Sequence, residues 1–350
     1  MKKHYTRVCN FAYGKSSAEL IKKKINLPLN GSKEISFGQV EIISRATCKI
    51  INLKDIKKLP KSLRKKIDKD LNVIVKRNKN FSNLNFSKIP NIMGVLNLTP
   101  DSFSDGGKFM KKKIGINHAK NLFKFGANII DVGGESTRPG SKPVHVKEEW
   151  NRIKKIIENI DKKIPLSIDT RKSEIMNKSI QIGIKLINDV SGLNYDSKTV
   201  EVLKKNRTPF VIQHSQGTPQ MMQKNPRYKN ELLDIYDFFE ERIKFIRSQG
   251  IKHNNILIDP GIGFGKNLKH NMNLIRSISI FHTLGFPILL GVSRKKFIKD
   301  LSGNNDTKGR LGGTVASSLY AIMQGVQVLR IHDVNELRQS IKVFEELIKS

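Results

Sequence analysis

The residues with the clearest chemical potential stand at the ends of short apolar runs. Eight such runs close with polar or charged side chains, at Asn97, Asp131, Asp169, Asn188, Gln213, Asp259, Ser293 and Arg330. A single aspartate in such a place can simply cap the next helix, and for any one residue that interpretation carries equal weight. Capping does not readily explain eight such ends. We therefore interpret them as parts of one site.

The side-chain types indicate what this site could bind. One group offers carboxylate and amide oxygens that suit the N–H edge of a flat nitrogen heterocycle: Asp169, Asn188 and Asp259. A second group follows the last two runs, where barrel enzymes often bind phosphate: Lys295, Arg330 and His332. The combination favours a nitrogen heterocycle that carries phosphate.

The elements that must position these residues repeat regularly from Ile89 onward. The apolar runs lie at 92–96, 129–132, 165–168, 186–190, 210–212, 256–258, 287–291 and 328–331. Amphipathic stretches lie between them, among them 147–160, 172–181, 231–248 and 312–323. Fully apolar short runs are typical of parallel strands covered on both faces. Eight of them with intervening helices predict an α/β fold of the (β/α)8 TIM-barrel type, and an open doubly wound sheet is the alternative.

Net charge divides the chain into two parts. The 64 basic and 31 acidic residues give +33. Residues 1–88 hold 22 basic and 6 acidic residues, so a quarter of the chain carries about half of the excess. Such charge could serve nucleic acid, a membrane surface or a polyanionic substrate. Lysine is abundant throughout and no nucleic-acid motif accompanies it, so we favour compositional bias, with nucleic acid unlikely as a partner.

Residues 1–88 stand outside the repeating pattern. They show a helix-like stretch near Ser17–Ile25, possible strands at Gln39–Ile43 and Val73–Val75, and a lysine-rich stretch from Lys54 to Lys69. We predict a small basic N-terminal extension, appended or only partly ordered, of unknown role. The barrel is then predicted to span residues 89–350.

Targeting signals are weak. No apolar run reaches the roughly 18 residues of a membrane-spanning helix, so no membrane association is expected. The basic first residues lack the apolar core of a secretory signal, although an organellar transit peptide stays open. Cys9 and Cys48 form neither a CxxC pair nor a disulfide framework. We expect a cytoplasmic protein.

Two glycine-rich motifs have to be set aside. Gly263–Lys266 is followed by Asn267, and Pro260 occupies the place of the first glycine, so this is not a nucleotide-binding P-loop. No GxGxxG turn opens a helix after a strand, so a dinucleotide-binding fold lacks its fingerprint.

Two long stretches, 93–107 (MGVLNLTPDSFSDGG) and 126–140 (GANIIDVGGESTRPG), are similar to the two signatures of dihydropteroate synthases. Shorter matches occur at 167–170, 187–192, 259–266, 291–295 and 330–334. The chain thus resembles this pterin-binding enzyme family from about Ile89 to its C-terminus.

The resemblance implies an enzyme of folate biosynthesis that condenses 6-hydroxymethyl-7,8-dihydropterin pyrophosphate with p-aminobenzoate. It implies a transferase with Mg2+ as its cofactor, and a homodimer, because the family commonly dimerises. The family is a target of sulfonamides, although the sensitivity of this chain is left open.

The resemblance also implies roles for individual residues. The pterin would be held by Asp169, Asn188, Asp259 and Lys295. The pyrophosphate would be bound by Asn97, which also contacts the metal, with Thr137, Arg330 and His332. The p-aminobenzoate pocket would include Phe103, Arg138, Pro139, Phe264 and Ser293. Catalysis would depend on Asn97, Asp101, Lys295, Arg330 and His332. We expect Arg330→Ala to remove turnover and to leave the fold intact.

One stretch departs from the family pattern. Family members usually carry Met-His-Met after the fifth strand, whereas this chain has Gln213-His214-Ser215. The polar replacements could loosen packing or add a hydrogen bond, and His214 could be structural or face the ligand.

Three alternatives remain at this point. A pterin-binding methyltransferase domain would use a related ring without a pyrophosphate clamp. A basic barrel could bind nucleic acid through residues 1–88, and truncation before Ile89 would then remove a salt-sensitive affinity. A degenerate, inactive synthase is disfavoured by the intact set of strand-end residues.

Overall fold

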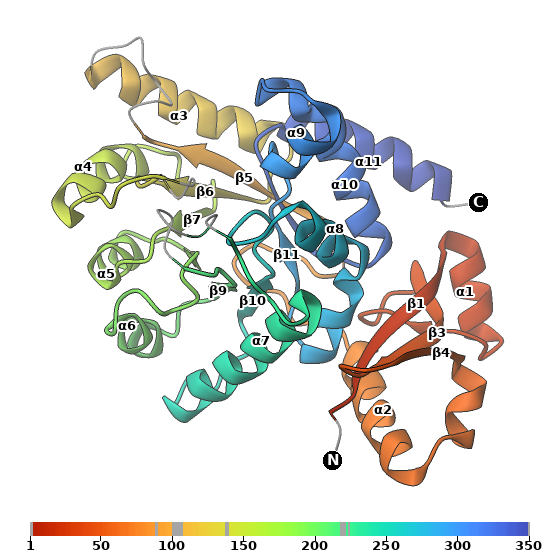
Figure 1. The fold of residues 1–350 in the computed structure, drawn as a ribbon. Coiled ribbons are helices and arrows are strands. Elements are labelled where there is room, and N and C mark those ends of the chain that lie inside the picture. The colour runs from red at the N-terminus through yellow and green to blue at the C-terminus, as the bar shows by residue number, and fades with distance from the viewer. Residues whose placement is uncertain are drawn as a thin grey trace.

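The computed structural model describes residues 3–87, 90–99, 108–136, 140–217, 222 and 225–348. Within these ranges the chain forms a barrel and a smaller N-terminal unit, residues 3–79, packed against its side (Figure 1). No described helix has the length and apolar character needed to cross a membrane.

Eight parallel strands form the barrel: β5 (Asn91–Asn97), β6 (Ile129–Gly133), β7 (Leu166–Asp169), β8 (Leu186–Asp189), β9 (Phe210–Gln213), β10 (Ile256–Asp259), β11 (Leu289–Leu290) and β12 (Val328–Ile331). Their order in the sheet is β10-β9-β8-β7-β6-β5-β12-β11. A parallel bridge between Ile258 and Ile288 joins the two ends of this sheet. The predicted barrel is therefore confirmed, and the open-sheet alternative is excluded.

Helices surround the sheet: α3 (Lys108–Lys124), α4 (Val146–Ile157), α5 (Ser173–Gln181), α6 (Thr199–Asn206), α7 (Glu231–Ser248), α8 (Leu268–Arg276), α9 (Lys296–Ser302), α10 (Leu311–Met323) and α11 (Val334–Ile348). Two 3-10 helices, η3 (Ile278–Leu284) and η4 (Lys308–Arg310), lie before β11 and α10. The outward side chains of the strands pack with these helices in one large apolar cluster. The four amphipathic stretches predicted from the sequence correspond to α4, α5, α7 and α10.

The barrel interior is layered. Its floor is apolar and consists of Met93, Ile129, Leu186, Val211, Leu257, Leu289 and Val328, with Leu84 and Phe86 beneath. Successive side chains of a strand point to opposite faces, so the residue two positions after a floor residue also points inward. On five strands that residue is polar, and we call these residues the inner row: Asp131, Asn188, Gln213, Asp259 and Arg330. The inner row lies above the floor, toward the carboxyl ends of the strands. We call this end of the barrel the barrel mouth.

The N-terminal unit is an ordered α/β structure. Strands β1 (Tyr5–Tyr13), β2 (Leu27–Pro28), β3 (Ile35–Ile43) and β4 (Cys48–Asn52) form an antiparallel sheet. Helices α1 (Gly14–Lys22), η1 (Leu53–Lys58) and α2 (Lys61–Ile74) accompany it, and the unit has its own apolar cluster.

One expectation about this unit needs correction, and one choice is narrowed. Of an appended unit and a partly ordered extension, the structure supports the appended unit, because its sheet and helices enclose a core. The strand predicted at Val73–Val75 is wrong, because residues 73 and 74 end α2. Ile67, Leu71 and Ile74 are buried on one face of that helix, and their spacing of four and three residues is helical.

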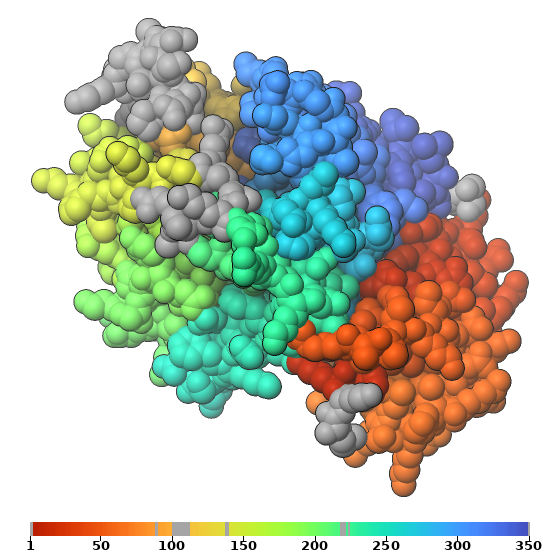
Figure 2. Space-filling view, in the orientation of Figure 1, coloured from red at the N-terminus to blue at the C-terminus, as the bar shows by residue number. Residues whose placement is uncertain are grey.

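The unit contacts the barrel through α7, η3 and the end of α10, and Figure 2 shows the two surfaces in close contact. The Tyr5 ring lies edge-on to the Tyr236 ring at 5.2 Å, and the Ser279 hydroxyl donates to the Val8 carbonyl at 2.9 Å. Residues Leu84 and Phe86 pack under the barrel floor. Barrel packing therefore includes residues that precede the predicted boundary at 88/89.

Candidate active site

A buried ion cluster, the Arg330 cluster, lies at the barrel mouth. The Arg330 Nε donates to Asp131 Oδ2 at 2.7 Å, and its Nη2 donates to Asp169 Oδ2 at 2.8 Å. Asp131 also accepts from Asn188 Nδ2 at 2.9 Å and from the Ser167 hydroxyl at 2.6 Å. Residues from β6, β7, β8 and β12 thus meet, as the sequence predicted for Asp169, Asn188 and Arg330.

Asp131 is one of the eight strand-end residues that the sequence assigns to the site, but the sequence gives it no individual role. Its carboxylate is fully buried and fixes both Arg330 and Asn188. Because Asn188 Nδ2 donates to Asp131, the Asn188 Oδ1 atom is left to face the interior as an acceptor. The signal was present in the sequence, as an aspartate in an otherwise apolar run.

Three buried polar atoms of neighbouring strands have no hydrogen-bond partner among the described residues: Asp169 Oδ1, Asn188 Oδ1 and Gln213 Nε2. Leaving such an atom unpaired costs about 1–3 kcal/mol. Native interiors pair nearly all their polar groups, so three unpaired atoms on neighbouring strands require an explanation. A bound ligand that supplies their hydrogen-bond partners would explain them.

Lys295 stands on the other side of the barrel mouth. Its ammonium group lies 4.2 Å from the centre of the Phe264 ring, in cation–π contact. A Cβ at Gly263 would lie 3.3 Å from Lys295 Cδ, so a glycine there leaves room for the lysine stem. Asp259, at the end of β10, accepts from the Gly261 amide at 2.7 Å. The structure thus brings Phe264 close to Lys295, as predicted.

Asn97, Ser293 and His332 complete the described part of the mouth. A Cβ at Gly133 would lie 3.5 Å from Asp169 Cβ and 3.6 Å from Asn97 Oδ1, so Asn97 and Asp169 flank one small gap. The Ser293 hydroxyl lies 3.0 Å from His332 Nδ1 and accepts from the His332 amide at 3.2 Å.

Burial perturbs the charged groups of the mouth. Burial raises the pKa of Asp169 to about 7, although Arg330 opposes this effect. Burial, helped by the charge of Arg330, lowers the pKa of Lys295 to about 8, and Asp259 and Asp169 oppose it. Burial also raises the pKa of Asp259. Acids and bases with shifted pKa values in a concave site are typical of functional centres.

His214 and Lys266 form a separate buried pair outside the inner row. The Lys266 ammonium lies 2.9 Å from His214 Nδ1 and donates to the Phe264 carbonyl at 2.9 Å. The His214 ring packs edge-on to Phe238 at 4.9 Å. Burial lowers the pKa of Lys266 to about 7 and that of His214 well below its usual value. Of the two interpretations of His214, the structure supports the structural one.

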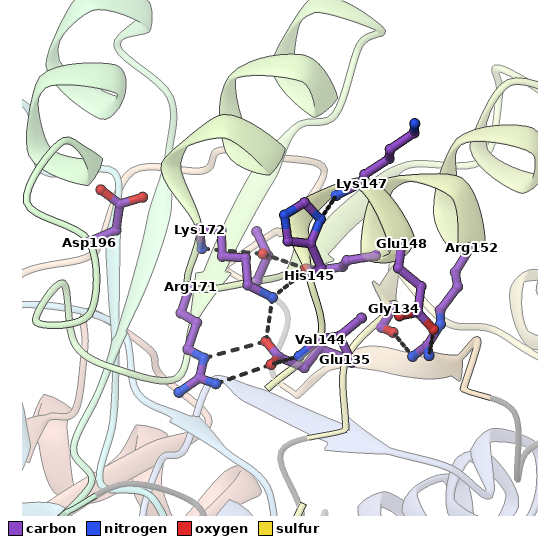
Figure 3. A network of polar contacts seen from close by, with 12 residues as sticks. Gly134, Glu135, Val144, His145, Lys147, Glu148, Arg152, Arg171, Lys172 and Asp196 are labelled. Carbon is purple, nitrogen blue, oxygen red and sulfur yellow. Dashed lines mark hydrogen bonds and ion pairs between the residues drawn. The ribbon is translucent and has the colours of Figure 1, made fainter. Parts of the chain in front are cut away.

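A second buried ion cluster, the Glu135 cluster, supports the loop after β6 (Figure 3). Glu135 accepts from Arg171 at 3.1 and 3.3 Å, from Lys172 at 3.0 Å and from the Val144 amide at 3.0 Å. Lys172 also bonds to Glu149, which accepts from the Thr170 hydroxyl at 2.6 Å. Burial favours the protonated form of Glu135, but its bonds to Arg171, Val144 and Lys172 outweigh burial and hold its pKa below the usual value.

Five predicted site residues lie outside the described residues: Asp101, Phe103, Thr137, Arg138 and Pro139. Their predicted roles stay predictions. The Glu135 cluster fixes the chain on both sides of residues 137–139, since it bonds Glu135 to Val144.

The fold and the mouth define a (β/α)8-barrel enzyme whose site combines hydrogen-bonding groups that lack partners among the described residues with part-buried cations. Comparison with known proteins specifies its kind. The sequence model of the family "Pterin binding enzyme" matches residues 93–332. A dihydropteroate synthase of Synechocystis is 39% identical over 258 residues, which cover 73% of this chain and 89% of that protein. The Escherichia coli K12 dihydropteroate synthase is also 39% identical and covers 75% and 93%.

Solved structures agree. The Yersinia pestis dihydropteroate synthase in complex with a sulfonamide drug superimposes with a TM-score of 0.71 at 38% identity, over 76% of this chain and 97% of that one. A Xanthomonas albilineans dihydropteroate synthase in complex with 7,8-dihydropteroate gives 0.68 at 33% identity, over 75% and 95%. The chain belongs to the dihydropteroate synthase family of pterin-binding enzymes.

Proposed function

We propose that this chain condenses 6-hydroxymethyl-7,8-dihydropterin pyrophosphate with p-aminobenzoate to give 7,8-dihydropteroate and pyrophosphate. The observation that carries the proposal is the set of atoms at the barrel mouth that lack partners among the described residues, beside two part-buried cations, Arg330 and Lys295. Relatives support it, since Xanthomonas albilineans structures hold 4-aminobenzoic acid and 7,8-dihydropteroate.

Pterin binding follows from hydrogen-bond complementarity. The ring presents amino and imino N–H groups along one edge, and Asp169 Oδ1 and Asn188 Oδ1 are acceptors without partners. Asp259 adds a buried carboxylate. Lys295 supplies a donor for the oxo or ring-nitrogen acceptors, since a pKa of about 8 keeps it mostly protonated at pH 7.

The reaction breaks the bond between the pterin methylene carbon and the pyrophosphate oxygen and forms a carbon–nitrogen bond to the arylamine. The amine is neutral near pH 7, so its lone pair attacks without prior deprotonation, and its extra proton leaves afterwards. Arg330 and His332 stabilise the departing anion. The bonds of Arg330 to Asp131 and Asp169 use two of its five N–H donors, and the rest suit phosphate oxygens. A preorganised contact of this kind is worth roughly 2.7–4 kcal/mol of barrier.

We propose Mg2+ as the cofactor, with Asn97 as its protein ligand. Mg2+ is commonly held by few protein groups together with substrate phosphates and waters. Asn97 fits this mode, since its Oδ1 atom is an amide oxygen that lies beside Asp169 at the mouth. When bound, the ion would neutralise charge on the leaving pyrophosphate.

We propose that p-aminobenzoate binds beside Phe264 and Ser293. Both belong to loops that adjoin the mouth, Phe264 in contact with Lys295 and Ser293 with His332. Phe103, Arg138 and Pro139 would complete the pocket. A homodimer and a cytoplasmic location also stay part of the proposal.

The test is an assay for 7,8-dihydropteroate with purified protein and both substrates, with Mg2+ and with excess chelator. We expect product with Mg2+ and strongly reduced product with chelator. Absence of product under both conditions would refute the proposed function, and equal product under both would refute the metal.

A further inference from the structure

Gln213 has no counterpart in the family pattern, where a methionine is usual. It ends β9, which lies between β8 and β10 in the barrel. Its Cα pairs with that of Asp259 across the β9–β10 ladder. Within the inner row, Gln213 therefore stands between Asn188 and Asp259, two residues assigned to pterin binding.

The side chain of Gln213 points inward and is fixed. Val211, two residues earlier, belongs to the barrel floor, so the alternation of the strand directs Gln213 to the interior. Gln213 is only 4% exposed. A Cβ at Gly261 would lie 3.3 Å from Gln213 Cγ, so the glutamine stem packs closely against this glycine. Gly261 also has a φ of +69°, which favours glycine.

The amide of Gln213 has an unused donor. Its Nε2 is buried and has no hydrogen-bond partner in the part of the chain that the structure describes. The neighbouring groups are mainly acceptors, because Asn188 presents Oδ1 and Asp169 presents Oδ1 without partners. A pterin ring carries both N–H donors and lone-pair acceptors, and ring acceptors that Lys295 does not reach would stay unpaired without a second donor.

We propose that Gln213 is a further pterin-binding residue, whose amide N–H donates to an acceptor atom of the ring. The inference rests on the proposed function and concerns how this chain selects its ring. A methionine has no N–H donor and could contact the ring only by packing, whereas the glutamine amide requires an acceptor. This chain therefore discriminates more strongly than a methionine variant against analogues in which that acceptor is replaced by C–H.

The test compares ligand binding by wild type, Gln213→Met and Gln213→Glu. The ligands are 6-hydroxymethylpterin and its deaza analogues, each with one ring nitrogen replaced by C–H, titrated calorimetrically. Gln213→Met should bind the parent ligand about three- to tenfold more weakly, as expected for a lost neutral hydrogen bond. The deaza analogue that lacks the accepting ring nitrogen should bind wild type and Gln213→Met with equal affinity. Gln213→Glu keeps the shape but loses the donor and adds charge near Asp169 and Asp259, so it should bind still more weakly.

Controls separate the possible failures. Gln181→Met, an exposed glutamine at the end of α5, should bind every ligand like wild type. Melting temperatures of the Gln213 variants show that they are folded. If wild type binds the parent ligand and Gln213→Met binds it equally well, the inference is refuted and the proposed function stands. If wild type does not bind the parent ligand, both are refuted.

Discussion

The two buried ion clusters of this barrel differ in how completely their atoms are paired. In the Glu135 cluster, both oxygens of Glu135 and of Glu149 accept hydrogen bonds. In the Arg330 cluster, Asp169 uses one oxygen for Arg330 and leaves the other without a partner. Both clusters lie near strand ends, and both are buried. Complete hydrogen bonding of the carboxylate oxygens, rather than burial or charge, therefore distinguishes a structural cluster from a ligand-binding one.

The largest expected effect comes from Arg330→Ala. The sequence suggested that this change would leave the fold intact. The structure shows that it would leave two buried carboxylates, Asp131 and Asp169, without their cation. Removing one partner of a buried ion pair costs about 3–5 kcal/mol. Turnover should also fall roughly 100-fold or more. Urea unfolding and initial rates measure the two losses.

The double variant Arg330→Met with Asp131→Asn is the control for this prediction. It removes the charge of Asp131, one of the two carboxylates left without a cation. Compared with Arg330→Ala, it should therefore recover part of the stability and none of the turnover. Wild-type stability and turnover in Arg330→Ala would show that the cluster has neither role.

The second prediction concerns the fully paired cluster. Lys172→Met leaves Glu149 without its cation, and the free energy of unfolding should fall by about 3–5 kcal/mol. Affinity for 6-hydroxymethylpterin should change less than twofold, because the Lys172 ammonium group bonds, within the described residues, only to Glu135 and Glu149. Calorimetry on the folded variant checks this. A large loss of pterin affinity at full stability would contradict the structural assignment.

The cations of the Glu135 and Arg330 clusters bond to carboxylates, whereas the buried Lys266 bonds to neutral acceptors. Its pKa is about 7 in the folded protein and 10.5 in the reference state. Between these values the unfolded chain binds more protons, so the wild type gains stability as the pH rises from about 7 to about 10.5. Lys266→Met lacks this gain. The difference in unfolding free energy between wild type and variant should shift by a few kcal/mol, since one pKa unit corresponds to about 1.4 kcal/mol.

Urea unfolding of wild type and Lys266→Met at intervals from pH 6.5 to 10 measures that difference. A difference that does not vary with pH would mean that Lys266 titrates normally.

The smallest effect is expected at the surface. Arg45 pairs with Asp234 at 2.7 Å and with Asp237 at 2.8 Å where the N-terminal unit contacts α7, but its side chain is 45% exposed. Exposed pairs typically contribute about 0.2–1 kcal/mol, so Arg45→Ala should cost less than 1 kcal/mol in thermal or urea unfolding. A loss comparable to that of Lys172→Met would show that exposed charge contributes as much as buried pairing here.

The barrel could be predicted because its signal is local. Each strand is a short apolar run, and parallel strands bring their carboxyl ends to one face whatever their distance in sequence. Arg330 and Asp131 are separated by 199 positions and still meet. The N-terminal unit gave no such signal. Val73 is β-branched and favours a strand locally, but Ile67, Leu71 and Ile74 form the buried face of a helix whose other positions are largely lysine, arginine and aspartate.

Pairing within the site could not be predicted from residue types. The sequence gives an asparagine at 188, but only the bond to Asp131 determines that its oxygen, and not its nitrogen, faces the interior. Likewise, the sequence shows only that Gln213 is polar where a methionine was expected. Its position between Asn188 and Asp259, known from the structure, indicates that its amide can reach a ligand. Tertiary partners decide which atoms of a side chain stay available.

The most direct measurement is a crystal structure with 6-hydroxymethyl-7,8-dihydropterin pyrophosphate bound. We predict that the ring donates to Asp169 Oδ1 and Asn188 Oδ1, two acceptors of the mouth that lack partners among the described residues, and that the pyrophosphate lies against Arg330 and His332. A ring bound elsewhere, with both oxygens still unpaired, would contradict the account.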